Sequence, residues 1–250
     1  MPKFFVPREN IRDDKIIING EDVAHIKKVL RLGIGDEITM CDGVGRDYSA
    51  KIHSIEDKEI TCGIISERKS DTEPNIKVTI YQGIPKGSKM DYIIQKTTEL
   101  GITKIVPCIM SRCVVKIESE KDALKKQSRW QKIAEEAAKQ SGRGIIPEVC
   151  MPCTFSEAVQ MMKQDDICFA PYECEETNTL KNTLSLCDNP LSVSFMIGPE
   201  GGYAANEAEQ LKQYNIPPVT LGKRILRTET AGEAVLSMVM YEIGDINLPH

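Results

Sequence analysis

Histidine is scarce in this 250-residue sequence, and its cysteines are not regularly spaced. The three histidines, His25, His53 and His250, lie far apart and lack the spacing of metal ligands. The nine cysteines are an odd number without a repeated spacing, which argues against the disulfide framework of a small secreted domain. One pair, Cys150 and Cys153, forms a C-x-x-C motif that no second pair accompanies. We therefore predict free thiols and no metal site; the alternative for this motif is a redox or metal-binding role.

The sequence also lacks long apolar runs. No stretch approaches the roughly 18 apolar residues of a membrane-spanning helix. The first ten residues, MPKFFVPREN, lack the apolar core of a secretion signal. The sequence therefore predicts a cytoplasmic protein with no membrane partner, and its length allows one large domain or two small ones.

An excess of basic charge is absent from the chain as a whole but present in its middle. The formal net charge is −5, which by itself gives no indication of nucleic-acid binding. Residues 71–150 nevertheless carry 14 basic against 10 acidic side chains, whereas residues 151–250 carry 6 against 14. This asymmetry is compatible with a phosphate-binding surface in the middle section.

Residues 1–70 have the pattern of a small β-barrel. Segments 16–20, 36–43, 47–55 and 59–65 are β-branched or alternate in polarity, and turn residues separate them. One helix is predicted over Asp22 to Leu32. Barrels of this size often bind RNA. The charged segment 66–75, SERKSDTEPN, is interpreted as a linker.

Residues 75–250 alternate between strands and helices. This rhythm predicts an α/β fold with a parallel sheet covered on both faces. The predicted strands are 76–84, 102–110, 145–149, 166–170, 191–198 and 218–222. The predicted helices are 88–100, 121–140, 155–164, 206–214 and 230–244.

The predicted helix over 121–140 has two different faces. Its basic residues fall on one arc, because an α-helix turns by roughly 100° per residue. The opposite side is apolar, with Leu124, Trp130, Ile133, Ala134, Ala137 and Ala138. A solvated surface is the simple interpretation of the basic arc. Its position in the basic middle section favours contacts of Lys125 and Arg129 with an RNA backbone.

Two loops carry the residues suited to ligand binding. Residues 195–202, FMIGPEGG, run from a buried strand into a glycine-rich loop, where backbone can approach a ligand closely. Residues 221–230, LGKRILRTET, place cations, hydroxyls and an acid before the last helix, which Thr228 or Thr230 is predicted to cap. The glycine spacing is not G-x-G-x-x-G, which argues against a dinucleotide-dependent oxidoreductase.

The two loops together closely resemble the RsmE family of ribosomal RNA uridine-N3 methyltransferases, within the SPOUT superfamily. The matching motifs are I-G-P-E-G-G and L-G-x-R-I-L-R-x-E-T-A. Further matches follow in order along nearly the whole chain: His25 to Arg31, Gln95-Lys96 with 99–101, 111–113, 130–133 and 141–143. Relatives usually carry a hydroxyl residue where this chain has Ala204, so Asn206 is expected to cap the following helix instead.

The resemblance implies a SPOUT-type domain over 75–250 with a deep trefoil knot, and a PUA-like RNA-binding barrel over 1–70. It implies S-adenosylmethionine as the cofactor and a homodimer with each site near the subunit interface. The implied substrate is a uridine in the decoding region of 16S ribosomal RNA, within the small ribosomal subunit.

The resemblance also assigns site residues. The cofactor pocket should contain Ile197, Gly198, Pro199, Glu200, Gly201, Gly202, Leu221, Gly222, Ile225, Leu226 and Arg227. RNA contacts should come from Arg8, Arg31, Lys89, Lys96, Arg112 and Arg143, besides Lys125 and Arg129.

Methylation of uridine N3 requires a base that removes its proton. Glu229 and Glu200 are the candidates, and Arg227 is expected to stabilise the negative charge on the uracil carbonyl oxygens. The alternatives are that Glu229 orients Arg227 and that Glu200 only holds its loop. A pure RNA-binding or assembly protein with an inactive pocket is the alternative from another functional class.

Overall fold

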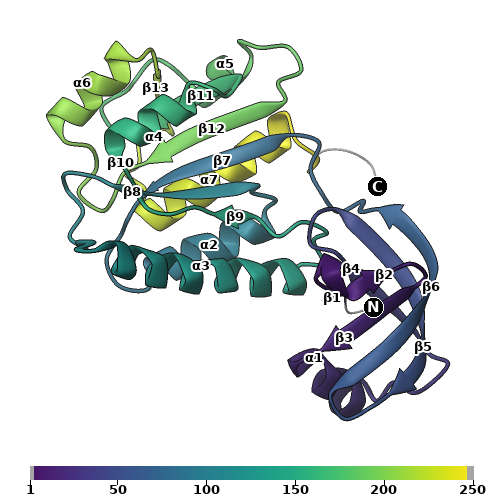
Figure 1. Ribbon diagram of the computed structural model, residues 1–250. Coiled ribbons are helices and arrows are strands. Elements are labelled where there is room, and N and C mark those ends of the chain that lie inside the picture. Colours follow the sequence, from purple (N-terminus) through teal and green to yellow (C-terminus); the bar gives the residue numbers. More distant parts are fainter. Residues whose placement is uncertain (1–2, 247–250) are drawn as a thin grey trace. The chain divides into compact units, whose positions relative to one another are not determined.

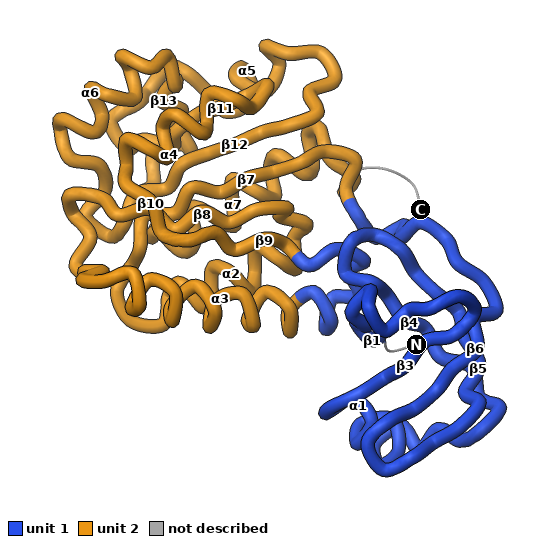
Figure 2. The backbone as a smooth tube through the Cα atoms, viewed as in Figure 1, with its two compact units in different colours: residues 1–73, 138–146 blue, residues 74–137, 147–250 orange. Residues whose placement is uncertain are grey.

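The chain forms two compact units. The computed structural model describes residues 3–246. Unit 1 comprises residues 1–73 and 138–146, and unit 2 comprises residues 74–137 and 147–250 (Figure 2). The helix over Glu120–Gln140 belongs to unit 2 up to residue 137, and its last residues belong to unit 1. The chain therefore passes from one unit to the other three times, after residues 73, 137 and 146.

Unit 1 is built on a curled six-stranded sheet with strand order β1-β4-β5-β6-β3-β2 (Figure 1). All neighbours are antiparallel except β1 and β4. The strands are β1 (Lys3–Phe5), β2 (Ile11–Arg12), β3 (Lys15–Asn19), β4 (Glu37–Cys41), β5 (Arg46–Ile55) and β6 (Glu59–Lys69), and a short 3-10 helix, η1, spans Arg8–Asn10. Alternating apolar side chains from these strands bury one face, including Ile16, Ile52 and Ile60.

The helix predicted over Asp22 to Leu32 is shorter and less regular than expected. It consists of α1 (Glu21–Ala24) followed by a π-helical stretch, η2 (His25–Leu30). The helix ends because Arg31 takes a left-handed conformation with φ of +54°. The stretch buries Val23 and Ile26 against the sheet, so its position depends on packing and not on helix propensity alone.

Residues 138–146 complete unit 1. Ile145 pairs with Val44 through an isolated β-bridge, and the Ile146 N–H donates to the Gly43 carbonyl at 3.0 Å. The Glu73 carboxylate accepts hydrogen bonds from the N–H groups of Gly144 and Ile145 at 2.7 and 3.0 Å.

Unit 2 contains a seven-stranded sheet in which every pair is parallel. The order is β10-β8-β7-β12-β11-β13, and β9 also pairs with β8. The strands are β7 (Lys77–Gly83), β8 (Lys104–Ile109), β9 (Glu148–Val149), β10 (Cys153–Thr154), β11 (Ile167–Pro171), β12 (Ser192–Ile197) and β13 (Pro218–Val219). The α/β class with a parallel sheet is thus confirmed.

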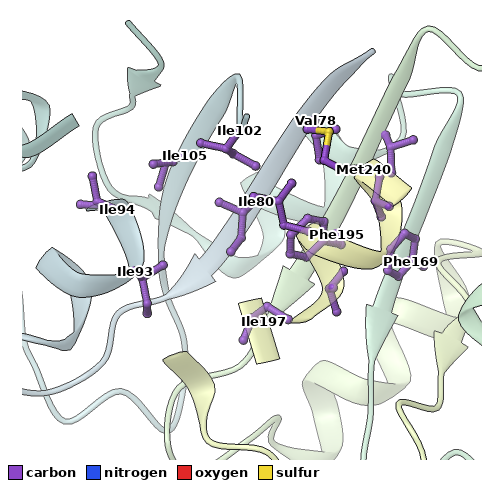
Figure 3. Packing of buried hydrophobic residues seen from close by; sticks show 14 of the residues in the cluster. Val78, Ile80, Ile93, Ile94, Ile102, Ile105, Phe169, Phe195, Ile197 and Met240 are labelled. Atoms are coloured by element: carbon purple, nitrogen blue, oxygen red, sulfur yellow. The ribbon is translucent and has the colours of Figure 1, made fainter. Parts of the chain in front are cut away.

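Helices cover both faces of this sheet. The helices are α2 (Lys89–Glu99), α3 (Glu120–Gln140), α4 (Phe155–Met162), α5 (Leu180–Leu184), α6 (Ala205–Gln213) and α7 (Thr228–Glu242). On one face, α2, α3, α5 and α7 bury the core that contains Ile80, Ile93, Phe195 and Met240 (Figure 3). On the other face, α4 and α6 pack over Tyr81, Val106 and Met196. The two faces alternate along β7, because neighbouring strand residues point in opposite directions.

Several predicted elements have different bounds in the structure. The strands expected over 145–149 and 218–222 contract to two residues each in β9 and β13, while α5 and β10 were not predicted. The apolar face predicted for α3 is correct for Trp130, Ala134, Ala137 and Ala138, all buried, but wrong for Leu124, which is 55% exposed. In the described residues, no helix combines the length and apolar character needed to cross a membrane.

Candidate active site

A cavity of about 460 Å³ opens at the carboxyl ends of β11, β12 and β13. Ligands of open parallel sheets bind at this edge, because the loops that leave neighbouring strands meet there. The wall of the cavity comes from the end of β11, the glycine loop after β12, the loop that precedes α7, and the beginnings of α2 and α7. All of these segments belong to unit 2.

The structure brings together all eleven residues predicted for the cofactor pocket. Ile197 to Gly202 form one side of the cavity, and Leu221, Gly222 and Ile225 to Arg227 form another. The remaining lining residues were not predicted to bind cofactor: Lys89, Pro171, Tyr172, Glu173, Tyr203, Arg224, Thr228 and Ala231. The position of residues 171–173 directly after a predicted strand was the available signal for three of them.

The conformation of the glycine loop explains its composition. Gly202 has a φ of +65°, a region that side chains other than glycine rarely adopt. A Cβ atom on Gly198 would lie 3.2 Å from the Cα of Gly202, so the two ends of the loop approach closely. Arg112 donates from Nη1 to the Gly201 carbonyl at 2.6 Å, and the Tyr203 hydroxyl donates to the Met196 carbonyl at 2.6 Å. The loop is therefore held from both sides.

The caps of the two following helices differ from those predicted. Helix α6 begins after Ala204, and the Glu207 carboxylate accepts the Ala204 N–H at 2.8 Å, so Asn206 is not the cap. Helix α7 begins after Arg227, which places Thr228 inside its first turn. The Thr228 hydroxyl donates to the Gly198 carbonyl at 2.7 Å and thus joins the two loops instead of capping the helix.

A lysine lies between two of the predicted catalytic residues. Lys89 Nζ lies 3.1 Å from Glu200 Oε1 and 3.4 Å from Glu229 Oε2. Partial burial raises the pKa of Glu200, but hydrogen bonds from its own backbone, from Lys89 and from the Lys86 N–H outweigh this effect, so its pKa is lowered. The pKa of Lys89 is raised, chiefly by its hydrogen bond to Glu200. Both groups are therefore charged at neutral pH.

The three candidate catalytic residues have different positions. Arg227 and Glu200 line the cavity, whereas Glu229 is not part of the lining and reaches it only through Lys89. Glu229 Oε2 is buried, and its partner within the described residues is the Lys89 ammonium at 3.4 Å.

The residues predicted to contact RNA are dispersed. Lys89 lines the cavity, Arg112 contacts the glycine loop, and Lys96 pairs with Glu99 at 2.9 Å on α2. On α3, Lys125 is exposed and Arg129 pairs with Asp91. In unit 1, Arg31 is exposed, and the largely exposed Arg8 donates to Asp42 at 3.1 Å.

Arg143 needs a corrected interpretation. Its side chain is only 3% exposed, and Nη2 donates to Glu73 Oε2 at 2.6 Å inside unit 1. A guanidinium in this position has almost no surface to offer an RNA phosphate. We therefore assign Arg143 a structural role in place of the predicted RNA contact.

Comparisons with known proteins agree with the fold. Residues 72–240 match the model of an RNA methyltransferase domain, and residues 18–65 match that of an RNA methyltransferase PUA domain. The chain is 38% identical to ribosomal RNA small subunit methyltransferase E of Bacillus subtilis (strain 168) over 229 residues, which cover 90% of this chain and 89% of that one.

A solved structure extends this similarity to three dimensions. It is the crystal structure of a ribosomal RNA small subunit methyltransferase E from Neisseria gonorrhoeae bound to S-adenosyl methionine. The TM-score is 0.85 at 33% identity, with 98% of this chain and 99% of that chain covered. This chain therefore belongs to the RNA methyltransferase family that includes ribosomal RNA small subunit methyltransferase E.

Proposed function

We propose that the protein transfers the methyl group of S-adenosylmethionine to N3 of a uridine in the decoding region of 16S ribosomal RNA. The observation that carries this proposal is the cavity at the strand ends, which collects every residue that the family resemblance assigns to the cofactor. Membership of an RNA methyltransferase family favours methyl transfer over the oxidoreductase alternative.

The residues of the cavity suit S-adenosylmethionine. Its volume of about 460 Å³ lies in the usual range for small-ligand pockets. Ile197, Leu221 and Leu226 supply apolar walls, and the glycines at 198, 201, 202 and 222 expose backbone to a ligand. The carboxylates of Glu173 and Glu200 suit a positively charged sulfonium. When bound, the cofactor supplies a methyl group on a sulfonium sulfur.

The chain's own residues must bind and orient the uracil and accept its N3 proton. Arg227 lines the cavity, so we assign its guanidinium to the uracil carbonyl oxygens, where negative charge develops as the proton leaves. Glu200 accepts the Lys86 N–H and pairs with Lys89, and these contacts help to lower its pKa, which suits a residue that holds its loop. Among the described residues, Glu229 has a single polar side-chain partner, the Lys89 ammonium at 3.4 Å, so we assign this less constrained carboxylate the role of base.

The other parts of the proposal concern RNA docking, the knot and the dimer. We infer that unit 1 docks the RNA and that Arg8, Arg31, Lys96, Arg112, Lys125 and Arg129 contribute contacts. Support comes from the PUA match in unit 1 and from the exposed Arg31 and Lys125. A trefoil knot and a homodimer complete the proposal. Ile225, 87% exposed at the rim of the cavity, is suited to be covered by a second subunit.

Methyl transfer from radiolabelled S-adenosylmethionine to small-subunit particles tests this function. The particles should come from a strain that lacks the endogenous activity, and mass spectrometry should identify the labelled nucleoside. We expect label in N3-methyluridine. Cofactor binding without label in these particles would contradict the proposed substrate. Absence of cofactor binding in calorimetry would favour the assembly-protein alternative.

A further inference from the structure

Gln82 is a fully buried polar side chain at the carboxyl end of β7, the strand next to β12. Its exposed fraction is 0%. The side-chain Nε2 donates to the Gly83 carbonyl and to the Thr228 hydroxyl, both at 2.9 Å, so both hydrogens of the amide are used. The amide oxygen, Oε1, has no hydrogen-bond partner among the described residues.

The hydrogen bonds of Thr228 determine the orientation of this amide. A hydroxyl has one hydrogen, and Thr228 donates it to the Gly198 carbonyl at 2.7 Å. Its oxygen must then accept a hydrogen bond from the other side, and Nε2 of Gln82 provides it. A flipped amide would place Oε1 against the Gly83 carbonyl and the Thr228 hydroxyl oxygen, which both act as acceptors here. The bonds therefore form a directed relay from Gln82 through Thr228 to Gly198.

The relay ends where the glycine loop begins. Gly198 follows β12 directly. Both Gly198 and Thr228 line the cavity. The same end of β7 also supports the next loop residue, because a Cβ atom on Gly83 would lie only 2.6 Å from the Pro199 N and Cδ atoms. Two neighbouring residues of β7 thus hold two neighbouring residues of the loop, one by hydrogen bonding and one by close packing.

We propose that Gln82 and Thr228 are positioning residues that hold the Gly198 carbonyl and thereby keep the glycine loop in the shape that binds cofactor. Gln82 is absent from the lining of the cavity, so it acts only through Thr228. The unpaired Oε1 is consistent with this role, since it is a buried acceptor left unsatisfied so that the amide hydrogens can serve the relay. The inference rests on the proposed function, because it concerns the same cofactor site.

Calorimetric titration with S-adenosylmethionine tests the relay. We expect Thr228→Val and Gln82→Leu each to raise the Kd about tenfold, since each removes a buried hydrogen bond and leaves its partner unpaired. Thr228→Ser keeps the hydroxyl and should bind within about twofold of wild type. Thr97→Val is the matched control, because Thr97 is also buried, outside the cavity, and its hydroxyl donates to the Ile93 carbonyl at 2.7 Å on α2.

The double variant Gln82→Leu/Thr228→Val separates a relay from two independent contacts. We expect it to bind no more weakly than the weaker single variant, because Gln82 acts on the Gly198 carbonyl only through the Thr228 hydroxyl, which Thr228→Val removes. Thermal unfolding should show similar losses for Thr228→Val and Thr97→Val, while only Thr228→Val weakens binding. If Gln82→Leu does not fold, the comparison of cofactor affinity between Thr228→Val and Thr228→Ser tests whether the hydroxyl is needed.

Two results would overturn the inference in different ways. Wild-type affinity in Thr228→Val, with cofactor binding intact in the unmodified protein, would reject the relay and leave the proposed function standing. Absence of binding in the unmodified protein would reject both.

Discussion

The ammonium of Lys89 lies 3.1 Å from the carboxylate of Glu200 and so ties the start of α2 to the glycine loop. Lys89 was predicted to contact RNA, yet in the described residues its ammonium pairs with two carboxylates, Glu200 in the cavity wall and Glu229 beside it. This pairing helps to lower the pKa of Glu200 and so keeps its carboxylate charged. Glu200 also accepts the Lys86 N–H at 3.2 Å, a contact that Glu229 does not make in the described part of the chain, so the two carboxylates proposed for catalysis should respond differently to mutation.

Glu229→Gln should slow single-turnover methyl transfer by at least about 10²-fold, because a general base contributes this much or more. Glu200→Gln should mainly raise the Kd for S-adenosylmethionine, since it releases the contacts of the loop with Lys86 and Lys89. Rapid-quench kinetics with saturating cofactor separates the two effects. Single-turnover rates near wild type in both variants would show that neither residue is the base.

The basic face of α3 should contribute to RNA affinity. Reversal of Lys125 and Arg129 to Glu is expected to weaken RNA binding and to lower the slope of log K against log salt by about two, because each phosphate contact releases about one counterion. Filter binding at several salt concentrations measures both quantities. Lys212→Glu, an exposed position on α6, is the control. Unchanged affinity and slope in the double variant would mean that this face is only solvated.

Arg143 should matter for stability and not for RNA binding. Arg143→Met leaves Glu73 buried without its cation, which is expected to cost about 3 kcal/mol in the free energy of unfolding. Urea denaturation provides the measurement. Arg68→Met is the control, since its pair with Asp71 is 66% exposed on both sides and should contribute less than about 1 kcal/mol. A stable Arg143→Met protein with weakened RNA binding would restore the original RNA-contact hypothesis.

Glu175 should make stability depend on pH in the acidic range. Hydrogen bonds from the N–H of Asn178 and from the side chain and N–H of Thr177 lower its pKa from 4.5 to about 2. A lowered pKa in the folded state means that the ionised carboxylate stabilises the fold above pH 4.5. This stabilisation is lost as the pH falls from 4.5 toward about 2.

The difference in unfolding free energy between wild type and Glu175→Gln should therefore shrink over this interval. Denaturation at a series of pH values measures it, with Glu176→Gln at the exposed neighbouring position as the control. A difference that stays constant from pH 6 to pH 2.5 would contradict the assigned hydrogen bonds.

Much of the fold could be read from local pattern. The alternation of strands and helices after residue 75 predicted the parallel sheet, and the glycines at 198, 201 and 202 indicated a close backbone approach to a ligand. The prediction of the sheet is confirmed, because side-chain period is a property of short segments, while the approach of a ligand to the glycines stays a prediction. Leu124 and the π-helical stretch at His25–Leu30 did not follow from the pattern, since packing against distant elements decides them.

The residue types of the two loops already indicate the family, and they predict the place of the cavity that we propose for the cofactor. The pairings within that site come from the tertiary structure: Lys89 with Glu200, Arg112 with Gly201, and Gln82 with Thr228. The same holds for residues 138–146, which join unit 1 through Glu73. Each of these contacts joins segments that are far apart along the chain. Local spacing carries no information about which of many charged or polar side chains will meet, because only the packing of the sheet and its helices brings them within bonding distance.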